Sequence, residues 1–194
     1  LASDPGFFCE AIRIVYRPKN TPKPEKDPTG EAKAIATKAY SLLREWRTPP
    51  GMLPDGRFSE ENFKQWLESV KVTCTESGHI EVALTHVGGV LIHCPPDPGG
   101  LWINRVVAET LNASDADKLR HGFSMGIFNS RGIHMVDPTG GPELELSEKY
   151  KKQAEDVENA GYQRLASTLR QLADWYTNEA KRIIDEAKRE QDSE

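Results

Sequence analysis

The fold class is decided by residues 142–190, which read PELELSEKYKKQAEDVENAGYQRLASTLRQLADWYTNEAKRIIDEAKRE. On both sides of Gly161 the apolar residues recur every three or four positions, which is the spacing of a helix that buries one face. Pro142 is typical of a helix start, and Gly161 of the residue that follows a helix end. The segment therefore predicts a long αα-hairpin. Its second helix is expected to bury Leu165, Leu169, Leu172, Ala173, Tyr176, Ala180, Ile183, Ile184 and Ala187.

The same period continues upstream, so we expect an all-α fold, a single irregular domain of about eight helices over residues 1–194. A loop rich in proline and lysine, residues 17–28, separates the first two helices. Before the hairpin, helices are expected at about 5–17, 30–47, 59–78, 79–93, 98–111 and 114–129.

Capping residues set these expected helix starts. Ser3-Asp4-Pro5 and Asp97-Pro98 each place a capping side chain before a proline, whose missing N–H has no consequence in a first helical turn. Ser59 is the expected cap of the third helix, and Ser114 opens the sixth. The signals agree with the apolar period, so they strengthen the prediction of helices.

The segment 79–93 is open to a second interpretation, because a valine-rich strand over residues 80–92 would also fit its composition. We expect a helix here. Interior glycines weaken an isolated helix by roughly 1 kcal/mol each relative to alanine. The expected helices 79–93 and 114–129 carry two each, so we predict close helix–helix contact at Gly88, Gly89, Gly122 and Gly126.

The composition excludes several classes of protein. A net charge of −5 argues against a general nucleic-acid binder, so nucleic acid is a possible but not a favoured partner. No apolar run approaches the roughly 18 residues of a membrane span, and no signal-peptide pattern opens the chain. Cys9, Cys74 and Cys94 have neither the number nor the spacing of a disulfide framework or a zinc site. We interpret them as buried free thiols in a reducing cytoplasm.

No catalytic motif is recognisable, so we predict no catalytic residue, no metal site and no cofactor. His79, His86 and His93 are seven residues apart, which on a helix is about 10 Å of rise and too far for one metal ion. Polar positions that face water or an interface explain them better. Paired carboxylates such as Glu143 and Glu145 are explained by the helix dipole at a first turn.

The loop 129–141 is the most site-like stretch and gives the candidate ligand-binding residues Asn129, Arg131, His134 and Asp137. An arginine beside the helix start at Pro142 could bind a phosphate or a carboxylate, and His134 with Asp137 could form an acid–base pair. A structural interpretation is favoured over both, because the same residue types end helices and build turns.

Several turns and caps also carry a resemblance: residues 42–46 with Pro50-Gly51, 97–102, 129–132 and 162–166. Together they resemble the C-terminal helical region of long, uncharacterised bacterial multidomain proteins. A chain that begins at Leu1 rather than methionine agrees with a fragment of such a protein. The resemblance implies a context and no activity.

We therefore expect a non-catalytic interaction or scaffolding module. Its expected partners are other domains of its parent protein, or a second copy of itself. The alternative is an anion or nucleic-acid binding module that uses the 129–141 loop. A helical enzyme centred on His134 and Asp137 is the weakest of the three hypotheses.

Overall fold

The computed structural model describes residues 1–19, 21–22, 29–132 and 136–191. Over these residues the chain is all-α and has no strand, which confirms the predicted class. A short 3-10 helix, η1 (Leu91–His93), follows the fourth α-helix. The α-helices are α1 (Pro5–Val15), α2 (Gly30–Glu45), α3 (Glu60–Glu76), α4 (Ile80–Val90), α5 (Arg105–Asn112), α6 (Asp117–Ser130), α7 (Gly141–Asn159) and α8 (Gln163–Gln191).

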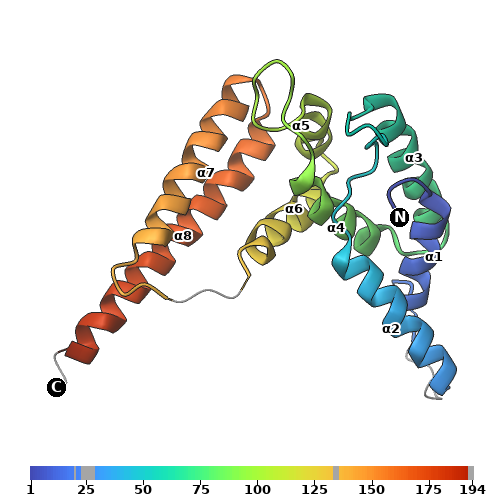
Figure 1. The fold of residues 1–194 in the computed structure, drawn as a ribbon, viewed down its shortest axis with the longest axis horizontal. Helices are drawn as coiled ribbons and strands as arrows, with labels where there is room; N and C mark the ends of the chain where they lie inside the picture. The colour runs from blue at the N-terminus through green and yellow to red at the C-terminus, as the bar shows by residue number, and fades with distance from the viewer. Residues whose placement is uncertain (20, 23–28, 133–135, 192–194) are drawn as a thin grey trace.

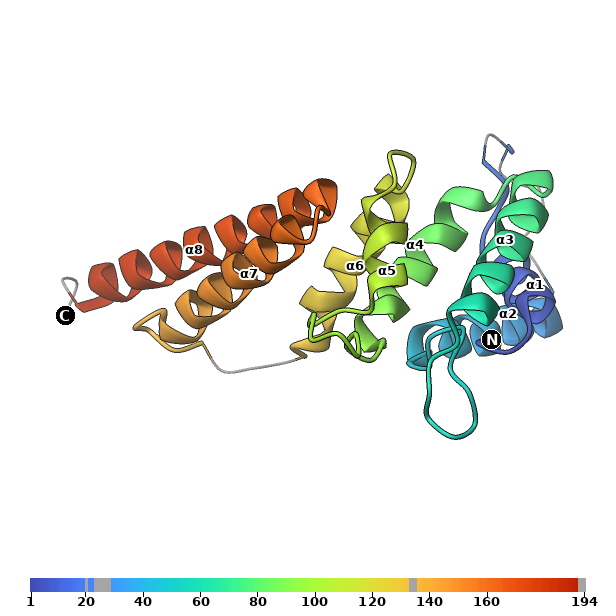
Figure 2. The same cartoon turned by 90° about the horizontal axis from the view of Figure 1, so that it is seen from above.

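The helices form two arms that diverge from a central group (Figure 1). Helices α1–α3 make one arm, the antiparallel pair α7–α8 makes the other, and α4–α6 lie between them. Seen from above, the same order runs along the long axis of the molecule, with the C-terminus at the tip of the hairpin (Figure 2). None of the described helices is both long and apolar enough to cross a membrane.

Two of the described helices begin at the capping residues predicted for them. Asp4 accepts a hydrogen bond from the backbone N–H of Phe7 at 3.0 Å, and Pro5 occupies the first turn of α1. Ser59 caps α3 in the same way, at 3.3 Å from the N–H of Asn62. Each cap supplies an acceptor for an N–H group that has no partner inside its helix.

Two predicted helix starts are wrong. Helix α5 begins at Arg105 with Asn104 as its cap, seven residues after the predicted start at Pro98. The Asp97 side chain is used in a turn instead, where it accepts the N–H of Gly99 at 2.7 Å and pairs with Arg105. Helix α6 begins at Asp117 rather than at Ser114, without a side-chain cap. A capping residue before a proline is thus also a turn signal, and local sequence does not distinguish the two.

The segment 79–93 is helical, as predicted, because α4 runs straight into η1. The glycine contacts are present as well. A Cβ atom added at Gly88 would lie 2.0 Å from the carbonyl oxygen of Leu119, and one added at Gly122 would lie 1.9 Å from that of Thr85. Helices α4 and α6 therefore cross with backbone against backbone, which only glycine permits.

The α1–α3 arm is built around an aromatic cluster. The ring of Phe8 lies 5.1 Å from that of Trp46 and 5.2 Å from that of Trp66, centroid to centroid. Beside them the buried thiols of Cys9 and Cys74 are 3.4 Å apart, and the Cys74 thiol donates to Cys9. The three cysteines are free, as predicted, although Cys94 is only partly buried. Of the predicted loop 17–28, residues 20 and 23–28 lie outside the described part of the chain.

The α7–α8 hairpin matches its prediction closely. Gly161 adopts a φ of +94°, which allows the chain to reverse between the two helices. Along the pair, Tyr150 of α7 stacks on Tyr176 of α8 at 5.7 Å between ring centroids. The predicted stripe of α8 is buried from Leu165 to Ile183, and Ile184 and Ala187 are partly buried.

Candidate functional site

The three predicted loop residues that the structure describes, Asn129, Arg131 and Asp137, have different partners and surroundings. Arg131 donates to the carboxylate of Glu143 at 2.6 Å, and its guanidinium lies 5.9 Å from the centre of the Tyr176 ring. Asp137 accepts from the hydroxyl of Thr139 at 2.7 Å and from its backbone N–H at 2.9 Å, and these bonds lower the pKa of Asp137. Asn129 is exposed and belongs to a different surface, described below. His134 lies outside the described residues.

Glu143 lies in the first turn of α7, as predicted, and its side chain is also 1% exposed, which the sequence did not indicate. A carboxylate at that depth requires a partner, because an unpaired buried charge is strongly destabilising. Arg131 provides one and so ties the end of α6 to the start of α7. The arginine of the candidate loop is therefore already engaged by a carboxylate.

A groove with a volume of about 550 Å³ is lined mainly by residues of α2, α4 and α6. We name it the α2–α6 groove. It is lined by Tyr16, Tyr40, Leu43, Arg44, Trp46, Arg47, Thr85, His86, Gly89, Val90, Ile92, His93, Gly122, Met125, Gly126, Asn129 and Ser130. Sequence reasoning predicted Asn129 as a site residue and did not predict the groove, because its walls come from helices far apart in the chain.

Glycine backbone forms the floor of the α2–α6 groove. Gly89 of α4 faces Gly122 and Gly126 of α6, and a Cβ atom at Gly126 would lie 2.6 Å from the carbonyl oxygen of Gly89. With no side chains at these positions the floor is low, while Tyr40 and Met125 stand exposed on the walls. The crossing that joins α4 to α6 therefore also makes the depression.

One wall carries a hydrogen-bonded pair of titratable groups. The hydroxyl of Tyr16 and Nε2 of His86 are 2.8 Å apart, and the two rings lie 5.4 Å apart between centroids. Burial lowers the pKa of His86, because a charged imidazole loses its hydration there. Burial also raises the pKa of Tyr16, and nearby Tyr40 adds to this effect. Both groups are therefore held neutral at neutral pH, and their bond joins the end of α1 to α4.

The rim of the groove is positive. Arg44 and Arg47 are exposed, and Arg47 donates to the carbonyl oxygens of Arg44 and Trp46 at 2.8 and 2.9 Å. Burial lowers the pKa of the neighbouring His93, and the charge of Arg47 lowers it further. Among the described residues that line the groove there is no aspartate or glutamate. The whole chain has a net charge of −5, so the positive charge of the groove lining is opposite in sign to that of the chain.

The three regularly spaced histidines have three separate roles. His79 is 4% exposed, so the expectation that it faces water or an interface is wrong. Its ring nitrogens lie 3.1 Å from the Ser77 hydroxyl and 3.2 Å from the Tyr16 carbonyl oxygen. His86 binds the Tyr16 hydroxyl, and His93 stands exposed on the rim. In the described part of the chain no group of three or more His, Cys, Asp or Glu side chains is placed to hold a metal ion.

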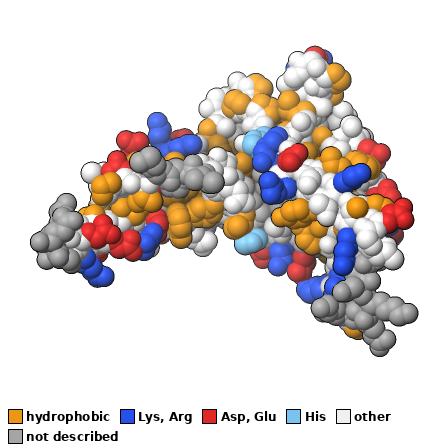
Figure 3. All heavy atoms as spheres, turned by 60° about the horizontal axis from the view of Figure 1, so that its bottom comes forward, with side chains coloured by type: hydrophobic (Ala, Val, Ile, Leu, Met, Phe, Trp, Pro, Cys, Tyr) orange, Lys and Arg blue, Asp and Glu red, His pale blue; other side chains and the backbone are white. Residues whose placement is uncertain are grey.

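A second groove of about 550 Å³ lies on another face of α6, between α6 and α8. We name it the α6–α8 groove. It is lined by Asp117, Arg120, His121, Ser124, Phe128, Arg164, Ser167, Thr168, Gln171, Leu172 and Trp175. Helix α6 thus contributes to both grooves, and the surface between the arms shows mixed apolar, basic and acidic side chains (Figure 3).

Comparison with known proteins gives no relative: no family model, no curated protein and no solved structure matches this chain. The two grooves are therefore interpreted from their own chemistry.

Proposed function

We propose that the chain is a non-catalytic interaction module whose α2–α6 groove receives an acidic, apolar segment of a partner. The observation that carries this proposal is the absence of acidic side chains from the lining of the groove in the described structure, while Arg44, Arg47 and His93 stand on its rim. Complementary charge of this kind selects partners and speeds their association. The partner is a neighbouring domain of the parent protein or a second copy of this chain.

The apolar content of the groove supports the same proposal. Tyr40 and Met125 are 46% and 43% exposed, and aromatic residues, methionine and arginine are enriched at protein interfaces. The indole N–H of Trp46, which also lines the groove, is buried and has no acceptor among the described residues. A buried donor without an acceptor costs about 1–3 kcal/mol. That N–H is enclosed by the folded chain, so the surface that a partner can cover is the exposed apolar surface of Tyr40 and Met125.

The alternative, an anion or nucleic-acid site in the 129–141 loop, is less well supported. Its arginine, Arg131, is engaged by buried Glu143, so an added anion would compete with a carboxylate already in place.

The proposed context is a larger bacterial protein in the cytoplasm, and the free thiols of Cys9, Cys74 and Cys94 support a reducing compartment.

The test uses short fluorescein-labelled peptides that alternate Asp or Glu with Leu, Phe or Trp, and the same peptides with Lys in place of the acids. We expect fluorescence anisotropy to show binding of the acidic series alone, and binding should weaken as salt is added because exposed charges are screened. The double variant R44E/R47E should lose at least tenfold in affinity, or about 1.4 kcal/mol.

The control is K64E/K71E, which makes the same change of charge on α3, outside the groove. It should bind as the unaltered protein does, and thermal melting followed by circular dichroism checks that both variants are folded. Equal binding of the acidic and basic series, or an unaffected R44E/R47E, would contradict the proposal. Sedimentation of the protein alone then distinguishes a second copy from a different partner.

A further inference from the structure

The α6–α8 groove holds a buried arginine that is only partly satisfied. Arg120 is 9% exposed and donates through Nη1 to the carbonyl oxygens of Leu111 and Ala113, both at 2.7 Å, and through Nη2 to Asp117. A guanidinium has five N–H groups. Three of them are used here, and the other two have no acceptor among the described residues.

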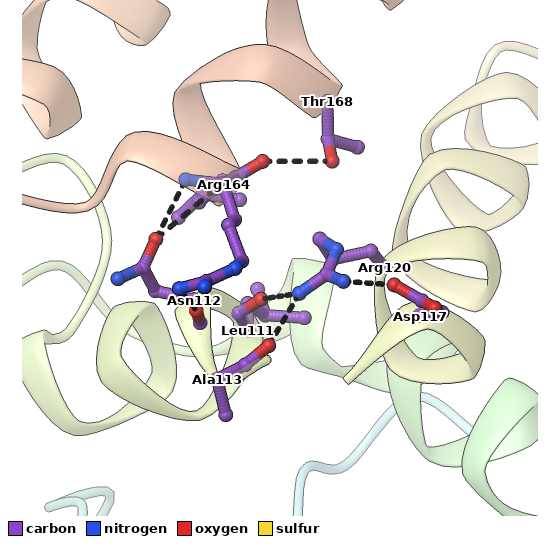
Figure 4. A network of polar contacts seen from close by, with 8 residues as sticks. Leu111, Asn112, Ala113, Asp117, Arg120, Arg164 and Thr168 are labelled. Carbon is purple, nitrogen blue, oxygen red and sulfur yellow. Dashed lines mark hydrogen bonds and ion pairs between the residues drawn. The ribbon is translucent and has the colours of Figure 1, made fainter. Parts of the chain in front are cut away.

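A second arginine reaches the same place from the opposite side. Arg164, in the first turn of α8, extends toward the end of α5, and Arg120 approaches that end from α6 (Figure 4). Nη1 of Arg164 lies 3.4 Å from the carbonyl oxygen of Asn112. Within the described part of the chain, no carboxylate is paired with Arg164. The backbone around it is fixed, because the Asn112 side chain accepts the N–H groups of Arg164 and Leu165.

The charges around these arginines do not cancel. The groove contains two guanidinium groups and one carboxylate, that of Asp117, whose side chain is 83% exposed. A carboxylate so exposed is screened by water and compensates little of a buried charge. The partial negative charge at the end of α5 offsets about half a unit more. A net positive potential therefore remains in the groove.

The rest of the groove offers hydroxyl groups and an apolar wall. Ser124, Ser167 and Thr168 line it beside the arginines. Phe128 and Trp175 meet edge to face at 4.6 Å between centroids, and Trp175 is 46% exposed, so an indole ring stands on the wall of the groove. Arginines and hydroxyls suit a phosphate group, and an exposed ring suits a flat ligand that can stack on it.

We propose that the α6–α8 groove binds a phosphate monoester that carries a flat ring, the chemistry of a nucleoside monophosphate. Arg120 and Arg164 hold the phosphate oxygens, and Trp175 packs against the ring. The proposal is independent of the α2–α6 groove, because the two grooves use different residues of α6.

The test measures binding of adenosine 5′-monophosphate, inorganic phosphate and adenosine by NMR titration of the whole chain. We expect adenosine monophosphate to bind at least tenfold more tightly than either inorganic phosphate or adenosine, because it alone makes both sets of contacts. R164Q should lose at least tenfold in affinity for the monophosphate. W175A should weaken its binding and leave that of inorganic phosphate unchanged.

Arg164 is chosen because it is exposed, so its substitution leaves the core intact. Arg120 also holds the end of α5, and R120Q could fail to fold for that reason alone. The matched control is R170Q, two turns along α8, where the arginine pairs with Glu158 outside the groove. R170Q should bind as the unaltered protein does. Unchanged binding by R164Q, or the same loss in R170Q, would overturn the proposal.

Discussion

The α4–α6 pair and the α7–α8 hairpin bring two helices together by opposite means. In the first, glycines remove the side chains and the backbones touch, as at Gly88 against Leu119 and Gly122 against Thr85. In the second, large side chains fill the space between the helices, and Tyr150 stacks on Tyr176 there. The first contact depends on shape at a few points, and the second on apolar area spread along two long faces.

This difference places the proposed α2–α6 binding surface at the glycine crossing and not on the hairpin. The glycine crossing leaves the low floor of the α2–α6 groove, where a partner can approach. The hairpin is closed on itself by its own side chains, and it lends only one edge of α8 to the α6–α8 groove. We therefore expect the two pairs to respond differently to changes in side-chain size and in pH.

The largest effect is expected from G122A. Its new Cβ atom would lie 1.9 Å from the carbonyl oxygen of Thr85, so α4 and α6 must separate. We expect a loss of about 4 kcal/mol or more in the free energy of unfolding, beyond most point mutations. Its control is G89A, where the nearest neighbouring atom is at 3.6 Å and alanine favours the helix by up to about 1 kcal/mol. Urea denaturation measures both, and equal stability of the two variants would contradict backbone contact.

A loss of stability that overlaps that of G122A at its upper end, and is confined to the hairpin, is expected from L169A. Leu169 is 1% exposed, and removing such a side chain costs about 2–5 kcal/mol. Native-state hydrogen exchange should show faster exchange in α7 and α8 than in α4 and α6, because the hairpin packs mainly on itself. L144A, on the exposed face of α7, should change little. Equal acceleration in both pairs would show that they unfold together and would weaken the comparison.

The smallest effect is expected from pH. Burial lowers the pKa of His86 below its ordinary 6.5, so the unfolded chain takes up its proton first as the pH falls. Stability should therefore be fully present above the ordinary pKa of histidine, near 6.5, and decrease as the pH falls below it. H86Q should reduce the dependence of the free energy of unfolding on pH. H93Q, at an exposed site, should reduce that dependence less. The sequence of the hairpin, residues 142–190, has no histidine, so exchange in α7–α8 should not follow the change.

The hairpin was predictable because its signals are local. The stripe from Leu165 to Ile183 repeats over many turns, and Gly161 marks the reversal. The start of α5 was not predictable in the same way. Asp97 and Asn104 are both good caps, and Asp97 is drawn into a turn by Arg105, a contact that local propensity does not show.

The candidate site was less predictable than the fold. The loop 129–141 attracted attention through its residue types, yet Arg131 is directed to Glu143, and Asn129 belongs to a groove whose other walls are α2 and α4. Arg120 and Arg164 are unremarkable in the sequence, and they come together only because α5, α6 and α8 meet. The absence of acids from the described lining of the α2–α6 groove is likewise a property of the assembled surface.

The sequence by itself determined the all-α class, the hairpin and the glycine contacts, because helical period, caps and interior glycines act over a few neighbouring residues. Only the tertiary structure decided which polar groups are buried, which charges are paired and where the grooves lie. These properties depend on distances between residues as far apart as Tyr16 and His86, and packing sets those distances.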